Sequence, residues 1–110
     1  MQIEDYDIDD ITILAIDGMI TIGSDHKLAE VFQKLVGEGR IKVVMDMTRV
    51  KYIDSLGIGQ IAGGYTQLQE NQGSLVLART NEKIRELLKL TGLQNHILTY
   101  ATVEEAVQAL

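Results

Sequence analysis

Short apolar runs open the chain and are separated by acidic residues. Residues 3–6 and 11–16 carry the first apolar side chains, and the polar pair Asp9 and Asp10 lies between them. Two such runs around a polar turn predict an antiparallel β-hairpin. Asp17 and Gly18 are expected to close the second strand, and residues 19–22 to form a short extended or irregular segment.

The apolar spacing changes to that of a helix after Ser24. One face carries apolar residues at intervals of three and four: Leu28, Val31, Phe32, Leu35 and Val36. Ser24 or Asp25 is expected to cap the amino end of this helix, and Gly37 or Gly39 to end it.

Strands and helices alternate through the rest of the chain. The segment 41–47 is short and β-branched, which predicts a central strand, and residues 74–78 and 97–99 predict two further strands. A helix begins at or just after Ser55, because apolar residues recur there at helical spacing: Leu56, Ile58, Ile61, Ala62, Tyr65 and Leu68. Residues 71–73 are expected to end it.

Two more helices are predicted from their caps. Asn81 is a favourable cap for a helix that Gly92 ends, and its inward positions are expected to be Ile84, Leu87, Leu88 and Leu90. Thr102 and Glu105 have the spacing of a capping box at the start of a final helix.

The predicted order is β-β-α-β-α-β-α-β-α in a single domain of residues 1–110. Strands that alternate with helices pair in parallel through right-handed crossovers. The fold class is therefore α/β, with a mixed, mostly parallel sheet and one antiparallel strand from the opening hairpin. Four helices are too few to cover both faces, so we expect them mainly on one side.

Composition narrows the class of protein. Asp and Glu number 16 against 10 Lys and Arg, and the net charge of −6 opposes binding to nucleic acid or anionic lipid. No apolar run reaches the roughly 18 residues of a membrane span, and the acidic first residues exclude a secretory signal there. The chain has no cysteine, which fits a reducing compartment. We expect a cytoplasmic domain that binds neither nucleic acid nor membrane.

The segment that begins at Asp54 has features that a helix start does not require. Asp54 and Ser55 are both favourable caps, so a capped helix could account for these two residues alone. Four glycines then follow within the helix: Gly57, Gly59, Gly63 and Gly64. Each destabilises a helix by up to about 1 kcal/mol relative to alanine, and together they leave a face that another backbone can approach. A serine at a helix N-terminus is also suited to carry a phosphate, because the N–H groups and the helix dipole favour an anion.

Other chemistry has weaker support in the sequence. Residues 57–62 match the G-x-G-x-x-[GA] dinucleotide pattern, but the next strand ends without the carboxylate that would bind a ribose. No G-x-S-x-G elbow is present, and His26 and His96 lack partners at metal-ligand spacing. Asp46 is expected to hydrogen bond to the loop after its strand. We therefore expect no catalytic residue, cofactor or metal site.

Residues 53–59, Ile-Asp-Ser-Leu-Gly-Ile-Gly, resemble the D-S-x-G-[LI]-G motif of STAS domains, the family of bacterial anti-sigma-factor antagonists. The similarity covers nearly the whole chain. Gly18 stands at the family's early glycine, residues 43–47 resemble the strand before the motif, and residues 89–93 and 102–106 resemble the late segment and the closing helix.

The resemblance implies a four- to five-stranded sheet and a phosphorylation switch. In this family the unphosphorylated domain binds an anti-sigma factor, usually a serine kinase, and thereby frees a sigma factor. The phosphorylated serine corresponds to Ser55, and a phosphatase acting there would reverse the switch. Together with the glycine face, the resemblance gives the expected partner-binding set: Thr21, Ser24, Asp54, Ser55, Leu56, Gly57, Gly59, Gln60, Gly63 and Gly64.

Two positions depart from the family pattern. Thr21 stands near its early acidic position, and Leu56 replaces a small residue. Two other functions remain open from the sequence. One is a STAS scaffold subunit, of a stressosome or a transport system, in which Ser55 is only a helix cap. The other is a small nucleotide-binding or hydrolytic enzyme.

Overall fold

The computed structural model describes residues 1–21 and 27–110 of the chain. In these residues the elements follow one another in this order: β1 (Gln2–Ile8), β2 (Ile11–Ile20), α1 (Lys27–Gly37), β3 (Lys42–Ile53), α2 (Ser55–Glu70), β4 (Ser74–Ala78), α3 (Glu82–Leu90), the 3-10 helix η2 (Leu93–Asn95), β5 (Thr99–Tyr100) and α4 (Val103–Ala109). The predicted caps of α1, Ser24 and Asp25, lie outside the described residues.

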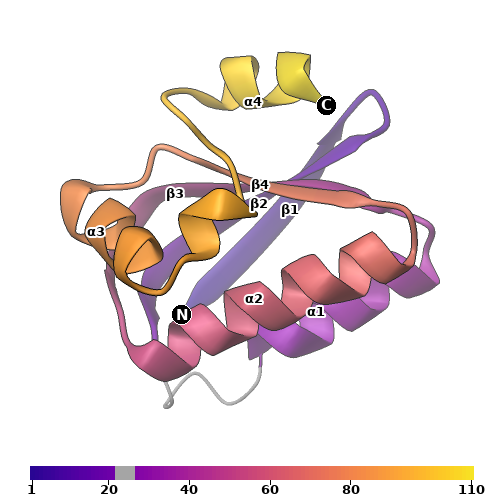
Figure 1. Ribbon diagram of the computed structural model, residues 1–110. Helices are drawn as coiled ribbons and strands as arrows, with labels where there is room; N and C mark the ends of the chain where they lie inside the picture. The colour runs from indigo at the N-terminus through magenta and orange to yellow at the C-terminus, as the bar shows by residue number, and fades with distance from the viewer. Residues whose placement is uncertain (22–26) are drawn as a thin grey trace.

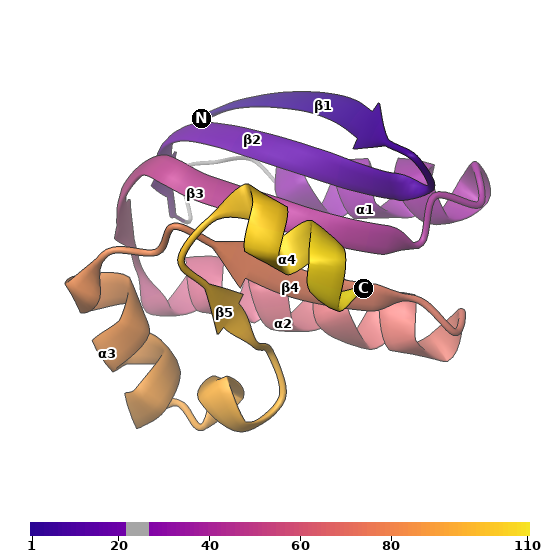
Figure 2. The same ribbon diagram turned by 90° about the horizontal axis from the view of Figure 1, so that it is seen from above.

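The strands form one five-stranded sheet in the order β1-β2-β3-β4-β5. β1 pairs with β2 antiparallel, and every later pair is parallel. Three helices, α1, α2 and α3, cover one face, whereas α4 lies on the other (Figures 1 and 2). The α/β class, the mostly parallel sheet and the placement of helices mainly on one side are confirmed.

The sheet separates two hydrophobic clusters. The larger one lies under α1, α2 and α3 and includes Leu14 from β2, Met45 from β3 and Phe32 from α1. The smaller one lies under α4, where Val44 and Val76 of the sheet meet Val103 and Ala106. Alternate residues of the central strands therefore serve different cores, as the period of two in a strand requires.

Among the described residues, no helix combines the length and apolar character needed to cross a membrane.

The central strands extend further than predicted. Asp17 and Gly18 do not end β2, which continues to Ile20, and β3 continues past Met47 to Ile53. The predicted loop after Met47 is therefore wrong. The charged residues Arg49 and Lys51 interrupt the apolar pattern, so the sequence does not indicate this extension. The backbones of β2 and β3 nevertheless stay paired up to Ile20 and Ile53 across two register shifts.

The region after β4 also differs from the prediction. Leu90 does not face inward but is 83% exposed at the end of α3. The last strand is residues 99–100 rather than 97–99, and Ile97 is buried outside any strand. The predicted caps are correct, because the Asn81 side chain accepts the Ile84 N–H and the Thr102 hydroxyl accepts the Glu105 N–H.

One arginine ties the opening hairpin to the turn before β3. The Arg40 guanidinium lies 2.7 Å from Asp5, 2.8 Å from Asp7 and 3.1 Å from Glu38. Its Nε also donates to the Thr12 hydroxyl, which in turn donates to Asp7. Hydrogen bonds from Arg40 and Thr12 hold the pKa of Asp7 below its usual 3.8.

This cluster should make stability depend on pH. Since the pKa of Asp7 is lower in the folded chain, its ion pair stabilises the fold above about pH 3.8 and loses that effect as pH falls further. We expect Arg40→Gln to unfold at lower urea concentration than wild type at pH 7, with the difference shrinking towards pH 3. The exposed Lys34→Gln removes the same charge elsewhere and serves as control. An Arg40→Gln deficit that stays constant from pH 7 to pH 3 would contradict the role of the carboxylates.

Candidate functional site

The amino end of α2 is built directly on the end of β3. The Asp54 side chain accepts the Gly57 N–H at 2.7 Å, and the Asp54 N–H donates to the Ile20 carbonyl at 3.2 Å. Asp54 is therefore the helix cap, and Ser55 is the first helical residue. Ser55 is exposed, and its hydroxyl makes no hydrogen bond within the described residues. The capping role that could have explained Ser55 belongs to its neighbour.

Gly57 allows α2 to start so close to β2. A Cβ at this position would lie 2.0 Å from the Ile20 carbonyl oxygen and 2.9 Å from the Ile53 side chain. The same Ile20 carbonyl accepts the Asp54 N–H. Because Gly57 has no side chain, the first turn of α2 can lie directly against the end of β2. This close contact positions Ser55.

Gly64 also serves internal packing. A Cβ there would lie 2.3 Å from the Phe32 ring of α1, so the glycine lets the two helices pack closely. Both Gly57 and Gly64 are buried. The prediction that these two glycines belong to a partner surface is wrong, because they face the protein's own interior.

The remaining two glycines lie on the outer side of α2. Gly59 and Gly63 are exposed, and a Cβ at either would meet no atom within 4 Å. Leu56 is 53% exposed in the first turn. An exposed strip therefore runs along the start of the helix and consists of Ser55, Leu56, Gly59 and Gly63.

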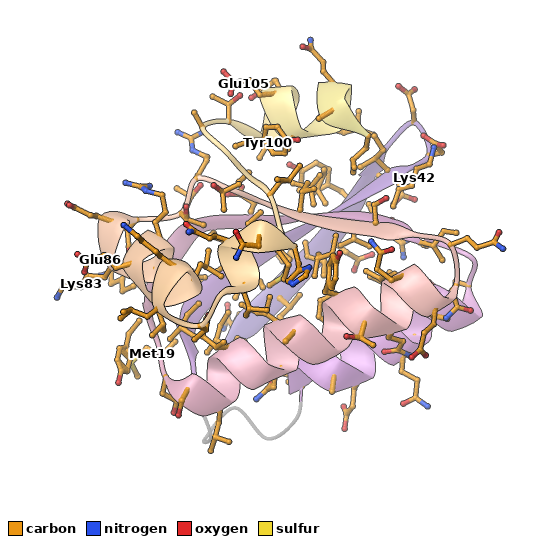
Figure 3. All side chains as sticks on the ribbon, in the orientation of Figure 1. Met19, Lys42, Lys83, Glu86, Tyr100 and Glu105 are labelled. Carbon is orange, nitrogen blue, oxygen red and sulfur yellow. The ribbon has the colours of Figure 1, made fainter. Side chains whose placement is uncertain are left out.

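Two apolar side chains that the sequence prediction missed lie at the same end of the sheet. Met19 of β2 and Tyr52 of β3 are directly paired in register and are 56% and 51% exposed. Figure 3 shows Met19 near the amino end of α2. With Ser55, Leu56, Gly59 and Gly63 they form what we call the Ser55 surface. The signal in the sequence was their position one residue before the buried Ile20 and Ile53.

The other predicted partner residues are placed less favourably. Thr21 is partly buried at the end of β2, and Ser24 lies outside the described residues. Gln60 is partly buried, and its side-chain oxygen has no hydrogen-bond partner among the described residues. Asp46 accepts bonds from the backbone and the hydroxyl of Thr48, as expected, although Thr48 belongs to the strand and not to a loop.

The dinucleotide interpretation does not fit this geometry. Gly57 and Gly59 lie inside α2 and not in a loop before it. Gly57 is also closed off by the Ile20 carbonyl, an acceptor that would repel a phosphate.

No cluster of three or more metal-ligating side chains occurs in residues 1–21 and 27–110.

The chain belongs to the STAS domain family, whose sequence model matches residues 2–106. It is 30% identical over 97 residues to the anti-sigma-B factor antagonist of Listeria monocytogenes, covering 88% of this chain and 84% of that protein. No enzyme family is indicated by these similarities.

Solved structures agree on the fold. The crystal structure of TM1081 from Thermotoga maritima has a TM-score of 0.91 at 27% identity, covering 97% of this chain and 92% of that one. An anti-sigma factor antagonist from Mycobacterium paratuberculosis has a TM-score of 0.88 at 21% identity, with 98% and 92% covered. The unphosphorylated form of the anti-sigma factor antagonist SpoIIAA has a TM-score of 0.77 at 16% identity, with 98% and 96% covered.

Proposed function

We propose that this protein is an anti-sigma-factor antagonist whose binding is switched by phosphorylation of Ser55. In the unphosphorylated state the Ser55 surface binds an anti-sigma factor, which frees a sigma factor for transcription. The anti-sigma factor is itself the serine kinase, and a phosphatase restores the binding state. The observation that carries this proposal is that Ser55 is exposed at a helix start while Asp54 supplies the cap.

The composition of the Ser55 surface supports a protein partner. Met19, Tyr52 and Leu56 are large apolar side chains, each more than half exposed, at the end of the sheet where α2 begins with Ser55. Exposed apolar groups gathered at one place mark interaction sites, and aromatic side chains are frequent anchors there. A phosphate on Ser55 would have to be desolvated when a partner covers this end of the sheet, so a single phosphorylation would oppose binding.

The alternative is a STAS scaffold without a phosphorylation switch. The same fold occurs in a sulfate transporter family protein from Wolinella succinogenes, with a TM-score of 0.80 at 17% identity. A shared fold does not decide between these functions, because function depends on the site. A scaffold gives no reason for an exposed serine at a helix start that Asp54 already caps.

Mass spectrometry tests the proposal. The protein is incubated with ATP and the anti-sigma factor kinases of its own genome, and the intact mass is measured. We expect a gain of one phosphate on the wild-type chain and none on Ser55→Ala. No gain with any of these kinases, or an equal gain on Ser55→Ala, would favour the scaffold.

Gly63→Glu should separate the partner surface from the fold. The new side chain meets open space and adds a charge to the strip beside Leu56, so binding should weaken at least tenfold. Stability should change little, since leaving glycine favours a helix. Gly37→Glu is a matched control at the carboxyl end of α1, where a Cβ also meets no atom within 4 Å. Equal binding by both variants in calorimetric titration would remove Gly63 from the interface.

A further inference from the structure

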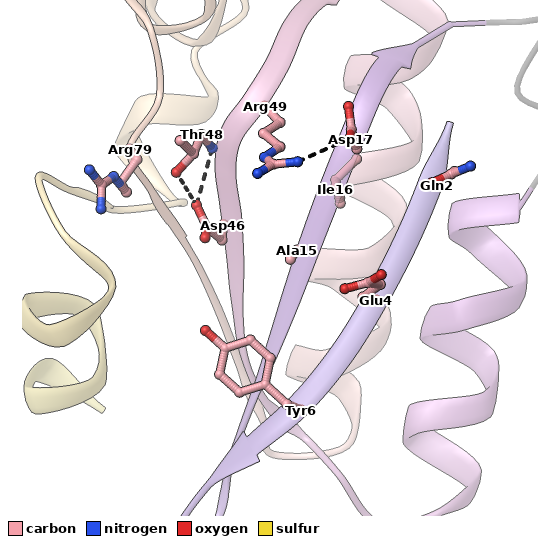
Figure 4. A pocket seen from close by; sticks show the side chains of 10 residues that line it. All are labelled: Gln2, Glu4, Tyr6, Ala15, Ile16, Asp17, Asp46, Thr48, Arg49 and Arg79. Carbon is pink, nitrogen blue, oxygen red and sulfur yellow. Dashed lines mark hydrogen bonds and ion pairs between the residues drawn. The ribbon is translucent and has the colours of Figure 1, made fainter.

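The outer face of the sheet contains a hollow that the Ser55 surface does not use. It has a volume of about 460 Å³ and lies between the side chains of β1 and the end of β4 (Figure 4). α4 packs on Val44, Val76 and Ala78 and leaves this half of the face open. The small side chain of Ala15 contributes to the lining between the longer side chains around it. The volume is in the range of sites for small molecules.

Charged groups of both signs line the hollow. Three carboxylates face two guanidinium groups: Glu4, Asp17 and Asp46 against Arg49 and Arg79. Asp17 and Arg49 are already paired at 3.6 Å, and one Asp46 oxygen accepts two bonds from Thr48. Glu4 and the Arg79 guanidinium have no ion pair or hydrogen bond within the described residues. Figure 4 shows these two on opposite sides of the hollow, with Asp46 on the side of Arg79.

Arg79 is held in an unusual backbone conformation. Its φ of +60° lies in the left-handed region, where glycine would be favoured. Of the other two non-glycine residues described with positive φ, Asp9 lies in the β1–β2 turn and Gln72 follows the end of α2. Arg79 instead follows β4 directly and carries a long charged side chain. Strained residues of this kind are enriched at ligand sites.

We propose that this hollow binds a small zwitterion, an α-amino acid. Its carboxylate would pair with the Arg79 guanidinium, which can hold a carboxylate through two parallel N–H bonds. Its α-ammonium group would face Asp46, and the side-chain ammonium of a basic amino acid would extend towards Glu4 on the opposite side (Figure 4). Because carboxylates outnumber guanidinium groups in the lining, a basic amino acid is favoured over an acidic one. This site is independent of the proposed function of Ser55.

The test is an NMR titration of the full chain with L-lysine, L-glutamate, cadaverine (lysine without its carboxylate) and sodium chloride at matched ionic strength. We expect saturable shifts at the amides of Tyr6, Ala15 and Asp46 with L-lysine, and binding at least tenfold weaker with L-glutamate and with cadaverine. Shifts that do not saturate, or that sodium chloride reproduces, would overturn the proposal. Cadaverine binding as tightly as L-lysine would also overturn it, since no carboxylate would then be recognised.

Variants locate the site without disturbing the fold. Arg79→Gly removes the guanidinium at a backbone position that suits glycine, and Glu4→Gln removes the opposite charge at nearly constant size. Each should weaken L-lysine binding at least tenfold. Lys83→Gln, on α3 and outside the hollow, removes one positive charge as the control and should bind as wild type does (Figure 3). Unchanged binding by Arg79→Gly would refute the assignment.

Discussion

Replacing Ser55 by aspartate is expected to weaken binding to the anti-sigma factor by about 100-fold or more, whereas Ser55→Ala should bind as tightly as wild type. A partner that covers Ser55 together with Met19, Tyr52 and Leu56 must remove water from the group at position 55. Burying an unpaired charge opposes binding by about 3 kcal/mol or more, and about 1.4 kcal/mol corresponds to a tenfold change. Alanine removes only a hydroxyl that makes no hydrogen bond within the described chain.

The fold should be intact in both variants. Ser55 is the first residue of α2, where N–H groups and the helix dipole stabilise a negative charge. The cap is Asp54 and is not altered by either change. Phosphorylation itself adds about −1.5 to −2 charge at pH 7, so its effect on binding should exceed that of aspartate.

Calorimetric titration of the two variants against the same anti-sigma factor measures this difference, and thermal unfolding checks the fold. Equal affinities of Ser55→Asp and Ser55→Ala, with both folded, would leave no role for Ser55 as a switch. Weak binding by both variants would instead show that the hydroxyl itself contacts the partner.

The regular parts of the fold could be predicted because local signals agree with tertiary packing there. Residues 74–78 form a strand with the predicted bounds, since its last four residues are apolar and buried on both faces of the sheet. Asn81 and Thr102 cap helices through bonds to backbone atoms only three residues away. Such features depend only on nearby residues, so the local sequence is enough to predict them.

The end of β3 could not be predicted in the same way. Arg49, Lys51 and Tyr52 are exposed, and the strand persists there because β2 supplies backbone partners through two register shifts. The resulting extension carries Tyr52 next to Met19 and brings both to the amino end of α2. Met19 and Tyr52 join the Ser55 surface because two distant strands pair. The periodicity of a single segment contains no information about such pairing.

The prediction places the four glycines of α2 on one face, although their spacing separates them. Gly57 and Gly64 fall in the stripe of Ile61 and Leu68, at intervals of four, three and four residues. Gly59 and Gly63 fall outside that stripe. Position relative to the buried stripe therefore distinguishes packing glycines from exposed ones, even where composition alone does not.

Gly57→Ala should destabilise the fold by about 3 kcal/mol, at the upper end of what overpacking a core does. Helix propensity alone predicts the opposite sign, a gain of up to about 1 kcal/mol. Geometry dominates because the added Cβ would lie 2.0 Å from the Ile20 oxygen, a backbone atom that also holds Asp54. Relief requires α2 to move away from β2, which breaks the Asp54 bond and displaces Ser55.

Gly59→Ala is the matched control, two residues along the same helix. Its Cβ meets no atom within 4 Å, so helix propensity acts alone and stability should rise by about 0.5–1 kcal/mol. Urea unfolding of the two variants at pH 7 gives both values from one kind of measurement. If Gly57→Ala were as stable as Gly59→Ala, contact with the Ile20 carbonyl would not determine how close α2 lies to β2. The position of Ser55 would then need another cause. A loss of stability in Gly57→Ala alone links the packing glycine to the placement of Ser55.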